Sequence, residues 1–424
     1  MTPDEKRSFA LSHPVHVGVD TGKTFHVMVA RGPDGRRTKP FKVLTTRDGF
    51  IAGREFLAST FPGTTFRQML VGIEFAGHHG FTFASFLRIW GFPIVTVMPM
   101  VTKRSKELED NSPLKTDAKD AATICRLTGE GLFVRFPFLQ SPYVELRLLT
   151  THRHRLSVEI VRYKNRLQGV LDLAWPEFLG QFSGLHKVTP RAILERWPLP
   201  NELVRAPRRQ VQKFIHDVSR GHIDRDKVRD LIDSAKITIA LLDAPLERRH
   251  EILGLLARWR LADEQVAQLE ERIGALVEQC PEAKALLSVP EVSAVCAATI
   301  VSEMGTPADF QHPRQILKLA GMNLVGSSSG AKSEQRALKW QSKRGRPALR
   351  RQLYLLAGRW CQKRGLLREE YLALRTRNGD LGTKAVASMA RKIVPVLFRV
   401  MQTGDRFDEA KWQADRRKRV SAPS

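Results

Sequence analysis

The first 140 residues alternate between short apolar runs and amphipathic stretches, which is the pattern of an α/β domain. Short runs rich in β-branched residues predict strands, and apolar positions at helical spacing predict the helices between them. The predicted strands are Val15–Asp20, Phe25–Ala30, Phe41–Leu44, Met69–Glu74 and Pro93–Met98. The predicted helices are Asp48–Thr60, Gly80–Trp90 and Leu114–Leu127, and the polar segment Lys103–Pro113 is expected to be a mobile loop. This order of elements predicts a mixed sheet.

After this region the pattern changes to long helices. Val144–Trp175 keeps leucines at helical spacing along its whole length, whereas Phe178–Pro200 is interrupted by Pro and Gly and should be irregular. Helices are expected again over Val211–Leu241 and Leu246–Gln279. The leucine spacing of the last segment favours an antiparallel hairpin or coiled-coil arm. An ordinary bundle core and an oligomerising arm explain this spacing equally well.

The last part of the chain predicts short helices joined by turns. Leu286–Gly305 should form a helix, a tight turn at Val289–Val292 and a second helix, and Arg314–Ala320 a further short helix. The small-residue segment Gly321–Ser333 is expected to be a loop. Lys343–Leu356 is basic and should be helical after its proline.

Charge changes this picture by indicating a partner. The chain has 69 Lys and Arg against 44 Asp and Glu, a net charge of +25. Residues 331–424 alone hold 24 basic and 8 acidic residues, a net charge of +16. An excess of this size predicts a polyanionic partner, most simply nucleic acid.

Cysteine usage and hydropathy indicate the compartment. The four cysteines are far apart and include no C-x-x-C pair, which argues against a structural zinc site and a disulfide framework. No apolar run approaches the ~20 residues of a membrane span. The N-terminus lacks the apolar core of a signal peptide. We therefore expect a cytoplasmic protein that does not bind a membrane.

Two aspartates at the start of a predicted helix are the first candidates for chemistry. Asp117 and Asp120 are three residues apart, so both carboxylates lie on one helix face, and Thr116 can cap the helix. Like charges on one face repel unless a cation lies between them. That cation is either supplied by Lys115 and Lys119 or is a divalent metal.

Distant carboxylates favour the metal. Asp20 ends the first predicted strand and Glu74 ends a later one. Alone, Asp20 is typical of a strand-end turn and Glu74 of a salt bridge. Together with Asp117 and Asp120, however, they make four carboxylates at element ends without a histidine partner, which suits two Mg²⁺ ions about 4 Å apart.

The segments around these carboxylates resemble a known family. VGVDTGK, GIEFAG and PLKTDAKDAATICRL are similar to the RuvC-like, DEDD-type domain of the Piv invertase and of transposases of the IS-one-ten (IS110) insertion-sequence family. LLSVPEVSAVCAATIVSEMG, FQHPRQILKLAGMNLVGSSSGAKS and SKRGRPALRRQLYLLA resemble the C-terminal transposase segment of that family. In that family the positions matching Asp20, Glu74, Asp117 and Asp120 are the metal-binding carboxylates.

The resemblance implies three domains. We expect an α/β RNase H-like (RuvC-like) domain over residues 1–140 and a helical coiled-coil domain over 141–284. A mostly α-helical, basic C-terminal transposase domain with a serine loop should cover 285–424. In this last domain, Lys343, Arg344, Arg346, Arg350 and Arg351 cluster around a helix start and are predicted to contact phosphates.

The resemblance also implies a nucleophile. Ser329 precedes Gly330 and matches the serine that forms a covalent link to DNA, with Ser328 as the alternative. A hydroxyl needs activation by a metal or a base, and the carboxylate-bound metal is the natural candidate. From the residues alone, S-S-S-G is more typical of a flexible linker.

The implied function is DNA recombination by an insertion-sequence transposase. Family resemblance further implies donor and target DNA, a guide RNA encoded by the element, and a dimer or tetramer. In this oligomer, the carboxylates of one subunit would cooperate with Ser329 of another subunit. The expected localisation is prokaryotic cytoplasm, in association with the nucleoid. Two alternatives remain: a RuvC-like metal-dependent junction nuclease that cuts by hydrolysis, and a non-catalytic nucleic-acid-binding scaffold.

Overall fold

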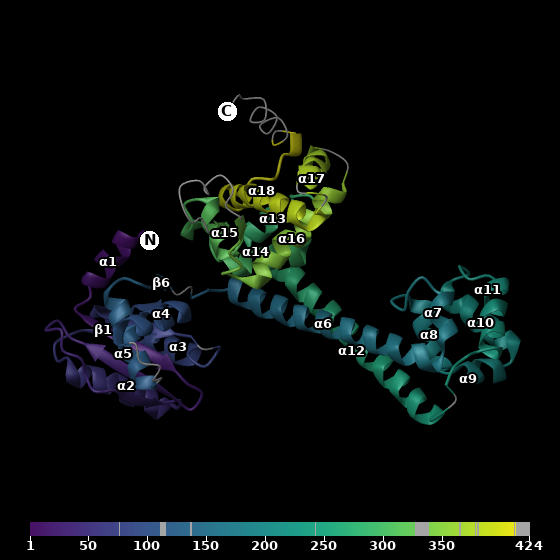
Figure 1. Cartoon of the computed structure of the whole chain (residues 1–424), viewed down its shortest axis with the longest axis horizontal. Helices are drawn as coiled ribbons and strands as arrows, with labels where there is room; N and C mark the ends of the chain where they lie inside the picture. The colour runs from purple at the N-terminus through teal and green to yellow at the C-terminus, as the bar shows by residue number, and fades with distance from the viewer. Residues whose placement is uncertain are drawn as a thin grey trace. The chain divides into compact units, whose positions relative to one another are not determined.

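The protein is described here by a computed structural model (Figure 1). The structure describes residues 1–75, 77–110, 116–135, 138–241, 243–326, 339–363, 366–377, 379, 381–410 and 412. The chain divides into two compact units, Met1–Phe138 and Leu139–Ser424. The domain boundaries expected at residues 140 and 284 stay predictions.

A six-stranded mixed sheet forms the centre of the first unit, in the order β3-β2-β1-β4-β5-β6. β1 pairs antiparallel with β2 and parallel with β4, so the sheet is mixed as the sequence predicts. The strands are β1 Val15–Thr21, β2 Phe25–Arg31, β3 Phe41–Leu44, β4 Met69–Glu74, β5 Ile94–Thr96 and β6 Val134–Arg135. β5 is shorter than predicted, and β6 was not predicted.

Helices cover both faces of this sheet. On one face, α2 (Arg47–Thr60) and α3 (Phe81–Ile89) pack with Val15, Val17 and Val19 of β1. On the other face lie α5 (Asp117–Gly129) and α1 (Pro3–Leu11). Because side chains alternate along a strand, the even-numbered residues of β1 face α5. Asp20 is one of these residues, so the candidate site lies on the side of the sheet that α5 covers.

The mobile loop predicted over Lys103–Pro113 is wrong for Lys103–Asp110, since α4 covers Pro99–Asp110. Asn111–Pro113 lie outside the described residues. The segment is helical despite its polarity because α4 is attached at two points: Thr102 is buried, and Lys106 forms an ion pair with Asp120 of α5.

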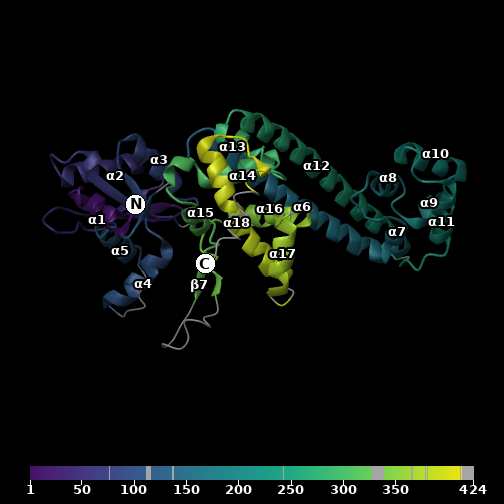
Figure 2. The same cartoon turned by 90° about the horizontal axis from the view of Figure 1, so that it is seen from above.

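In the second unit, two long helices lie side by side (Figure 2). These are α6 (Tyr143–Ala174) and α12 (Pro245–Glu278), close to the predicted bounds. One end of the pair contributes Leu146, Ile273 and Val277 to a core shared with the C-terminal helices. Its other end packs into a separate core with short helices. The pair is a helical arm with a core at each end.

Those short helices are α7 Pro176–Gln181, α8 Val188–Arg196, α9 Pro200–Arg205, α10 Arg208–Ser219 and α11 Arg225–Lys236. The helical character expected over Val211–Leu241 is confirmed by α10 and α11, with a break between them. The irregular structure expected over Phe178–Pro200 is wrong for Val188–Arg196, which form α8. Arg220 takes a left-handed backbone conformation with φ 51°, followed by Gly221, and this ends α10.

The C-terminal part of the second unit is mostly helical, as predicted. Its helices are α13 Pro281–Leu286, α14 Ala294–Met304, α15 Pro313–Leu319, α16 Pro347–Gln362, α17 Leu366–Arg377 and α18 Gly382–Thr403, with a 3₁₀ turn at Pro307–Asp309. A second 3₁₀ turn, at Phe66–Gln68, lies in the first unit. The predicted turn separates α13 from α14, and Glu291 occupies its left-handed position with φ 64°. Within the described residues, no helix is long and apolar enough to cross a membrane.

A small hairpin departs from the loop expected over Gly321–Ser333. β7 (Leu324–Gly326) pairs antiparallel with β8 (Lys339–Gln341), so that prediction is wrong for Leu324–Gly326. Residues 327–333 lie outside the described part of the chain. Pairing with a segment thirteen residues further along is a tertiary contact that local composition does not reveal.

Candidate active site

Two of the predicted carboxylates lie side by side on neighbouring strands. Asp20 of β1 and Glu74 of β4 are direct partners in the parallel register. The Thr21 hydroxyl donates a hydrogen bond of 2.8 Å to the backbone oxygen of Glu74, which ties the two strand ends together. The sequence placed both residues at strand ends, and the pairing brings them to the same edge of the sheet.

A pair of glycines brings α5 against this sheet. Gly18 and Gly72 are also register partners, each two residues before a carboxylate, so they face the same side as Asp20 and Glu74. A Cβ on Gly18 would lie 2.2 Å from the backbone oxygen of Ala121 in α5. The backbone of α5 therefore rests on the backbone of β1, an approach that any larger residue would prevent.

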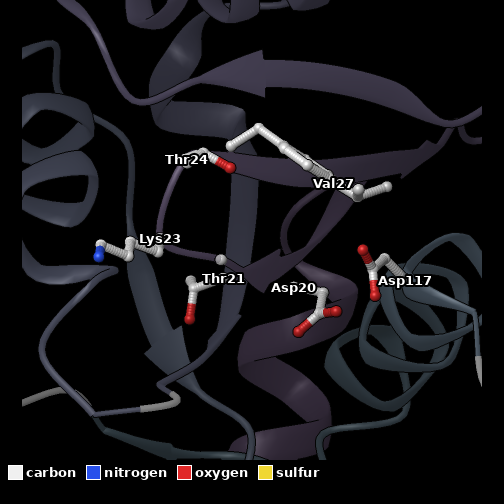
Figure 3. A pocket seen from close by; sticks show the side chains of 8 residues that line it. Asp20, Thr21, Lys23, Thr24, Val27 and Asp117 are labelled. Atoms are coloured by element: carbon white, nitrogen blue, oxygen red, sulfur yellow. The ribbon is translucent and has the colours of Figure 1, made fainter.

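Because α5 packs closely against β1, the first turn of α5 lies near the ends of β1 and β4. Thr116 caps the helix as predicted, with its hydroxyl accepting from the Lys119 N–H at 3.2 Å. Asp117 is exposed, whereas Asp120 is only 5% exposed. Figure 3 shows Asp117 beside Asp20 at a shallow cleft that the segment 20–25 and Val27 also line.

The other three carboxylates act electrostatically on Asp20. The pKa of Asp20 is raised to about 6, first by burial and then by repulsion from Asp120, Asp117 and Glu74, while Lys106 opposes the shift. We call these four residues the carboxylate group. The structure thus gathers every acidic residue that the sequence nominated.

The chemistry of this group suits a hard divalent cation. Glu74 Oε2 is buried and accepts no hydrogen bond from the described part of the chain. Carboxylate oxygens are what Mg²⁺ prefers. Among the described residues, however, no three acidic, His or Cys side chains are close enough to hold one ion. The donor types fit a metal, but these side chains do not form a closed set of ligands.

Lys106 is the residue at this site that the sequence interpretation missed. Its ammonium pairs with Asp120, and both side chains are largely buried, at 18% and 8% exposure. The sequence analysis missed Lys106 because it predicted a loop there, and a lysine in a loop does not indicate a functional role. The signal that could have found it is a lysine in a segment that begins with Pro99 and the apolar Met100 and Val101.

The other predicted functional residues lie in the second unit. Ser328 and Ser329 fall outside the described residues. Lys343 and Arg344 are exposed. Arg350 instead donates to the Ala320 oxygen at 2.9 Å.

The remaining two basic residues have internal contacts. Arg351 contacts the His154 ring of α6, and Arg346 contacts Glu303 of α14. The predicted phosphate contacts of the five basic residues stay predictions, and the last three each have an internal contact in this structure.

Arg346 belongs to a second half-buried charged group. Arg147 Nη2 lies 3.8 Å and Arg346 Nη1 3.4 Å from Oε2 of Glu303. Burial, then repulsion from Arg346, lowers the pKa of Arg147 to about 10, and Glu303 opposes this shift. We call Arg147 and Arg346 the arginine pair. It joins the starts of α6 and α16 to the end of α14.

Comparison with known proteins matches both ends of the chain. Residues 17–176 match the family model of the DEDD-type IS110 transposase, and residues 283–372 match the model described as transposase of the IS116/IS110/IS902 family. The chain is 25% identical over 404 residues to the IS110 insertion-element 43.6 kDa protein of Streptomyces coelicolor, covering 93% of this chain and 95% of that protein. It is 24% identical over 408 residues to the IS116 insertion-element 44.8 kDa protein of Streptomyces clavuligerus, covering 93% and 96%.

Proposed function

Because the chain belongs to the transposase family of the IS110 and IS116 insertion elements, we propose that it cleaves and exchanges DNA strands at the carboxylate group. Family membership implies DNA binding, and the mixed sheet is compatible with the RNase H-like fold of DEDD transposases. The observation that carries the proposal is geometric: Asp20 and Glu74 are register partners at adjacent strand ends, and Asp117 lies beside Asp20 (Figure 3). The pKa of Asp20, raised by burial and then by the three other carboxylates, supports it. Perturbed acids of this kind concentrate at functional sites.

Asp20, Glu74, Asp117 and Asp120 would hold Mg²⁺, and the unpaired oxygen of Glu74 supports this assignment. When bound, the metal activates a nucleophile and stabilises the leaving oxygen in phosphoryl transfer. Calorimetric titration with Mg²⁺ tests the assignment without DNA. Glu74→Gln should weaken binding strongly, while Glu55→Gln, an exposed change on α2, should leave it unchanged. Equal binding by both variants would remove Glu74 from the ligands.

Ser329 would attack a DNA phosphate, with Ser328 as the alternative. The serine oxygen forms a bond to phosphorus, the bond to a deoxyribose oxygen breaks, and the serine proton passes to a base. The Mg²⁺ that the carboxylate group would hold is the proposed activator of the serine hydroxyl. An adduct of protein and DNA that survives denaturation should form with Ser327→Ala and be lost with Ser329→Ala. An adduct lost with Ser328→Ala instead would move the nucleophile by one residue.

The same trapping experiment separates the alternatives. A hydrolytic junction nuclease would cut DNA and leave no covalent adduct in any variant. A non-catalytic scaffold would bind DNA without cutting it, and Asp117→Asn would change nothing. We favour the recombinase because both halves of the chain match transposase models.

We further propose a guide RNA and a composite site. The net charge of +25 is consistent with holding RNA and DNA together. Sequencing the nucleic acid that co-purifies with the protein tests the RNA, and one abundant RNA species is expected. For a site shared between subunits of a dimer or tetramer, mixing Asp117→Asn with Ser329→Ala protein should restore part of the cleavage. If the two variants assemble together but cleavage does not return, Asp117 and Ser329 of a working site come from the same chain.

A further inference from the structure

The far end of the helical arm carries a small domain of its own, which we call the arm tip (α7–α11). Its core includes Trp175, Phe178, Ile193 and Leu203. The two matched family segments end at residue 176 and resume at 283, so nearly all of the arm tip lies outside both. The function proposed above therefore gives this domain no task.

One helix of the arm tip presents a straight row of basic side chains. Arg209, Lys213 and His216 follow one another at intervals of four and three residues along α10, which places them on one helix face, and Arg220 follows as the residue that caps the end of the helix. All four are exposed. The spacing of Arg209, Lys213 and His216 along the helix axis is about 6 and 4.5 Å, at 1.5 Å per residue. The opposite face of α10 is buried in the arm-tip core.

The neighbouring helix α11 shows that this row is not a general property of the arm tip. On α11, Arg229 lies 2.9 Å from Asp226, and Lys236 lies 2.8 Å from Asp233, so basic and acidic groups neutralise each other. Within the described residues, Arg209, Lys213 and Arg220 form no ion pair, whereas His216 Nδ1 lies 3.6 Å from Asp217 Oδ1. The positive charge of α10 is therefore available to an outside partner.

A further cation lies beside this row. The guanidinium of Arg196 in α8 stacks over Phe214 of α10, 4.7 Å from the ring centroid, and also over Trp197 at 5.1 Å. Stacking orders this exposed side chain against the base of α10. The arm tip thus offers five cationic or protonatable groups on two adjoining helices, held by a packed core.

From these observations we propose that α10 docks on the phosphate backbone of duplex DNA. A straight row of cations matches the regular phosphates of a straight duplex better than those of a folded RNA. Phosphate contacts of this kind position a protein without reading sequence. The 32 residues of α6 span about 48 Å, so the arm is longer than one helical turn of DNA. The arm tip could therefore contact DNA more than one turn away from the other end of the arm. The inference rests on the proposed DNA recombination and adds a second, non-catalytic DNA contact to it.

The test compares two variants that lose the same charge. The α10 variant carries Arg209→Gln, Lys213→Gln and Arg220→Gln, and the α11 control carries Arg225→Gln, Lys227→Gln and Lys236→Gln. All six residues are exposed, so both variants should keep the wild-type melting temperature. Binding of the full-length protein to a duplex of about four helical turns is followed by fluorescence anisotropy between about 50 and 200 mM salt.

We expect the α10 variant to flatten the slope of log K against log salt by about 2 to 3, and the control by less than 1. Equal slopes for wild type and the α10 variant, or equal losses in both variants, would overturn the proposal. So would a loss seen only with a folded RNA of similar length. If wild type itself failed to bind DNA, the proposed function would fall as well, which distinguishes the two failures.

Discussion

The carboxylate group and the arginine pair are both sets of like charges held half-buried, but they are neutralised to different degrees. Arg147 and Arg346 share Glu303, so two positive charges meet one negative charge. Among the charges that shift the pKa of Asp20, those of three carboxylates raise it and that of Lys106 lowers it. Burial, and then this excess, raise the pKa of Asp20 to about 6. In the arginine pair the shared carboxylate joins three helices, whereas the carboxylate group retains an excess of negative charge that the proposed metal would neutralise.

The largest expected effect tests the carboxylate group. Asp20→Asn, Glu74→Gln, Asp117→Asn or Asp120→Asn should each lower strand cleavage on the order of 1000-fold or more, because each removes a charge needed at the reacting phosphate. Cleavage of labelled donor DNA gives the rate, and circular dichroism checks the fold. Wild-type cleavage by any one variant would exclude that residue from the site.

The next effect tests the arginine pair. Glu303→Gln leaves two guanidinium groups near each other without a carboxylate, and should cost about 3 kcal/mol of unfolding free energy. Denaturant unfolding measures this loss, provided that the dependence of the unfolding free energy on denaturant concentration is the same in wild type and variant. Adding Arg147→Met should recover part of it, since one of the repelling charges is then removed. Simple addition of the two losses would show that Arg147 and Glu303 are not coupled.

A smaller effect is the pH dependence of stability. The folded pKa of Asp20, about 6, lies above its ordinary value of 3.8, so protonated Asp20 favours the folded state. Stability from this group is complete below pH 3.8 and is lost as pH rises through about 6. Asp20→Asn should therefore stabilise the protein by about 1–2 kcal/mol at pH 7.5 and have no effect near pH 3.5. Equal melting temperatures of wild type and variant at pH 7.5 would contradict this reasoning.

The smallest effect concerns the cation beside the carboxylate group. Lys106 lowers the pKa of Asp20, so Lys106→Met should raise that pKa further and move the pH midpoint of the stability difference upward. Lys103→Met, an exposed change on the same helix, is the matched control. A midpoint that moves equally in both variants would assign the effect to net charge and not to the Lys106–Asp120 pair.

Much of the first unit could be predicted because its signals are local. Alternation placed β1 and β4 correctly, and the ends of these strands placed Asp20 and Glu74 at one edge. The N-cap Thr116 was likewise visible three residues before the backbone N–H that it accepts from. Family resemblance then joined these carboxylates into one group.

What failed depended on contacts between distant segments. α4 has a mostly polar sequence, and its helix is supported by the ion pair of Lys106 with Asp120, which no local pattern contains. The internal contacts of Arg346 and Arg350 required knowing that α14 and the end of α15 lie beside α16. The break between α10 and α11 rests on a left-handed Arg220, a conformation more typical of glycine.

The seating of α5 on the glycine pair has a consequence for the newly synthesised chain. Gly18 and Gly72 come together only when β1 has paired with β4, and α5 can dock only on that pair. Until then, Asp20 and Asp120, one hundred positions apart in the sequence, are not neighbours. In a nascent or partly folded polypeptide, the carboxylate group is consequently not yet assembled, so the site depends on completion of the sheet and on docking of α5.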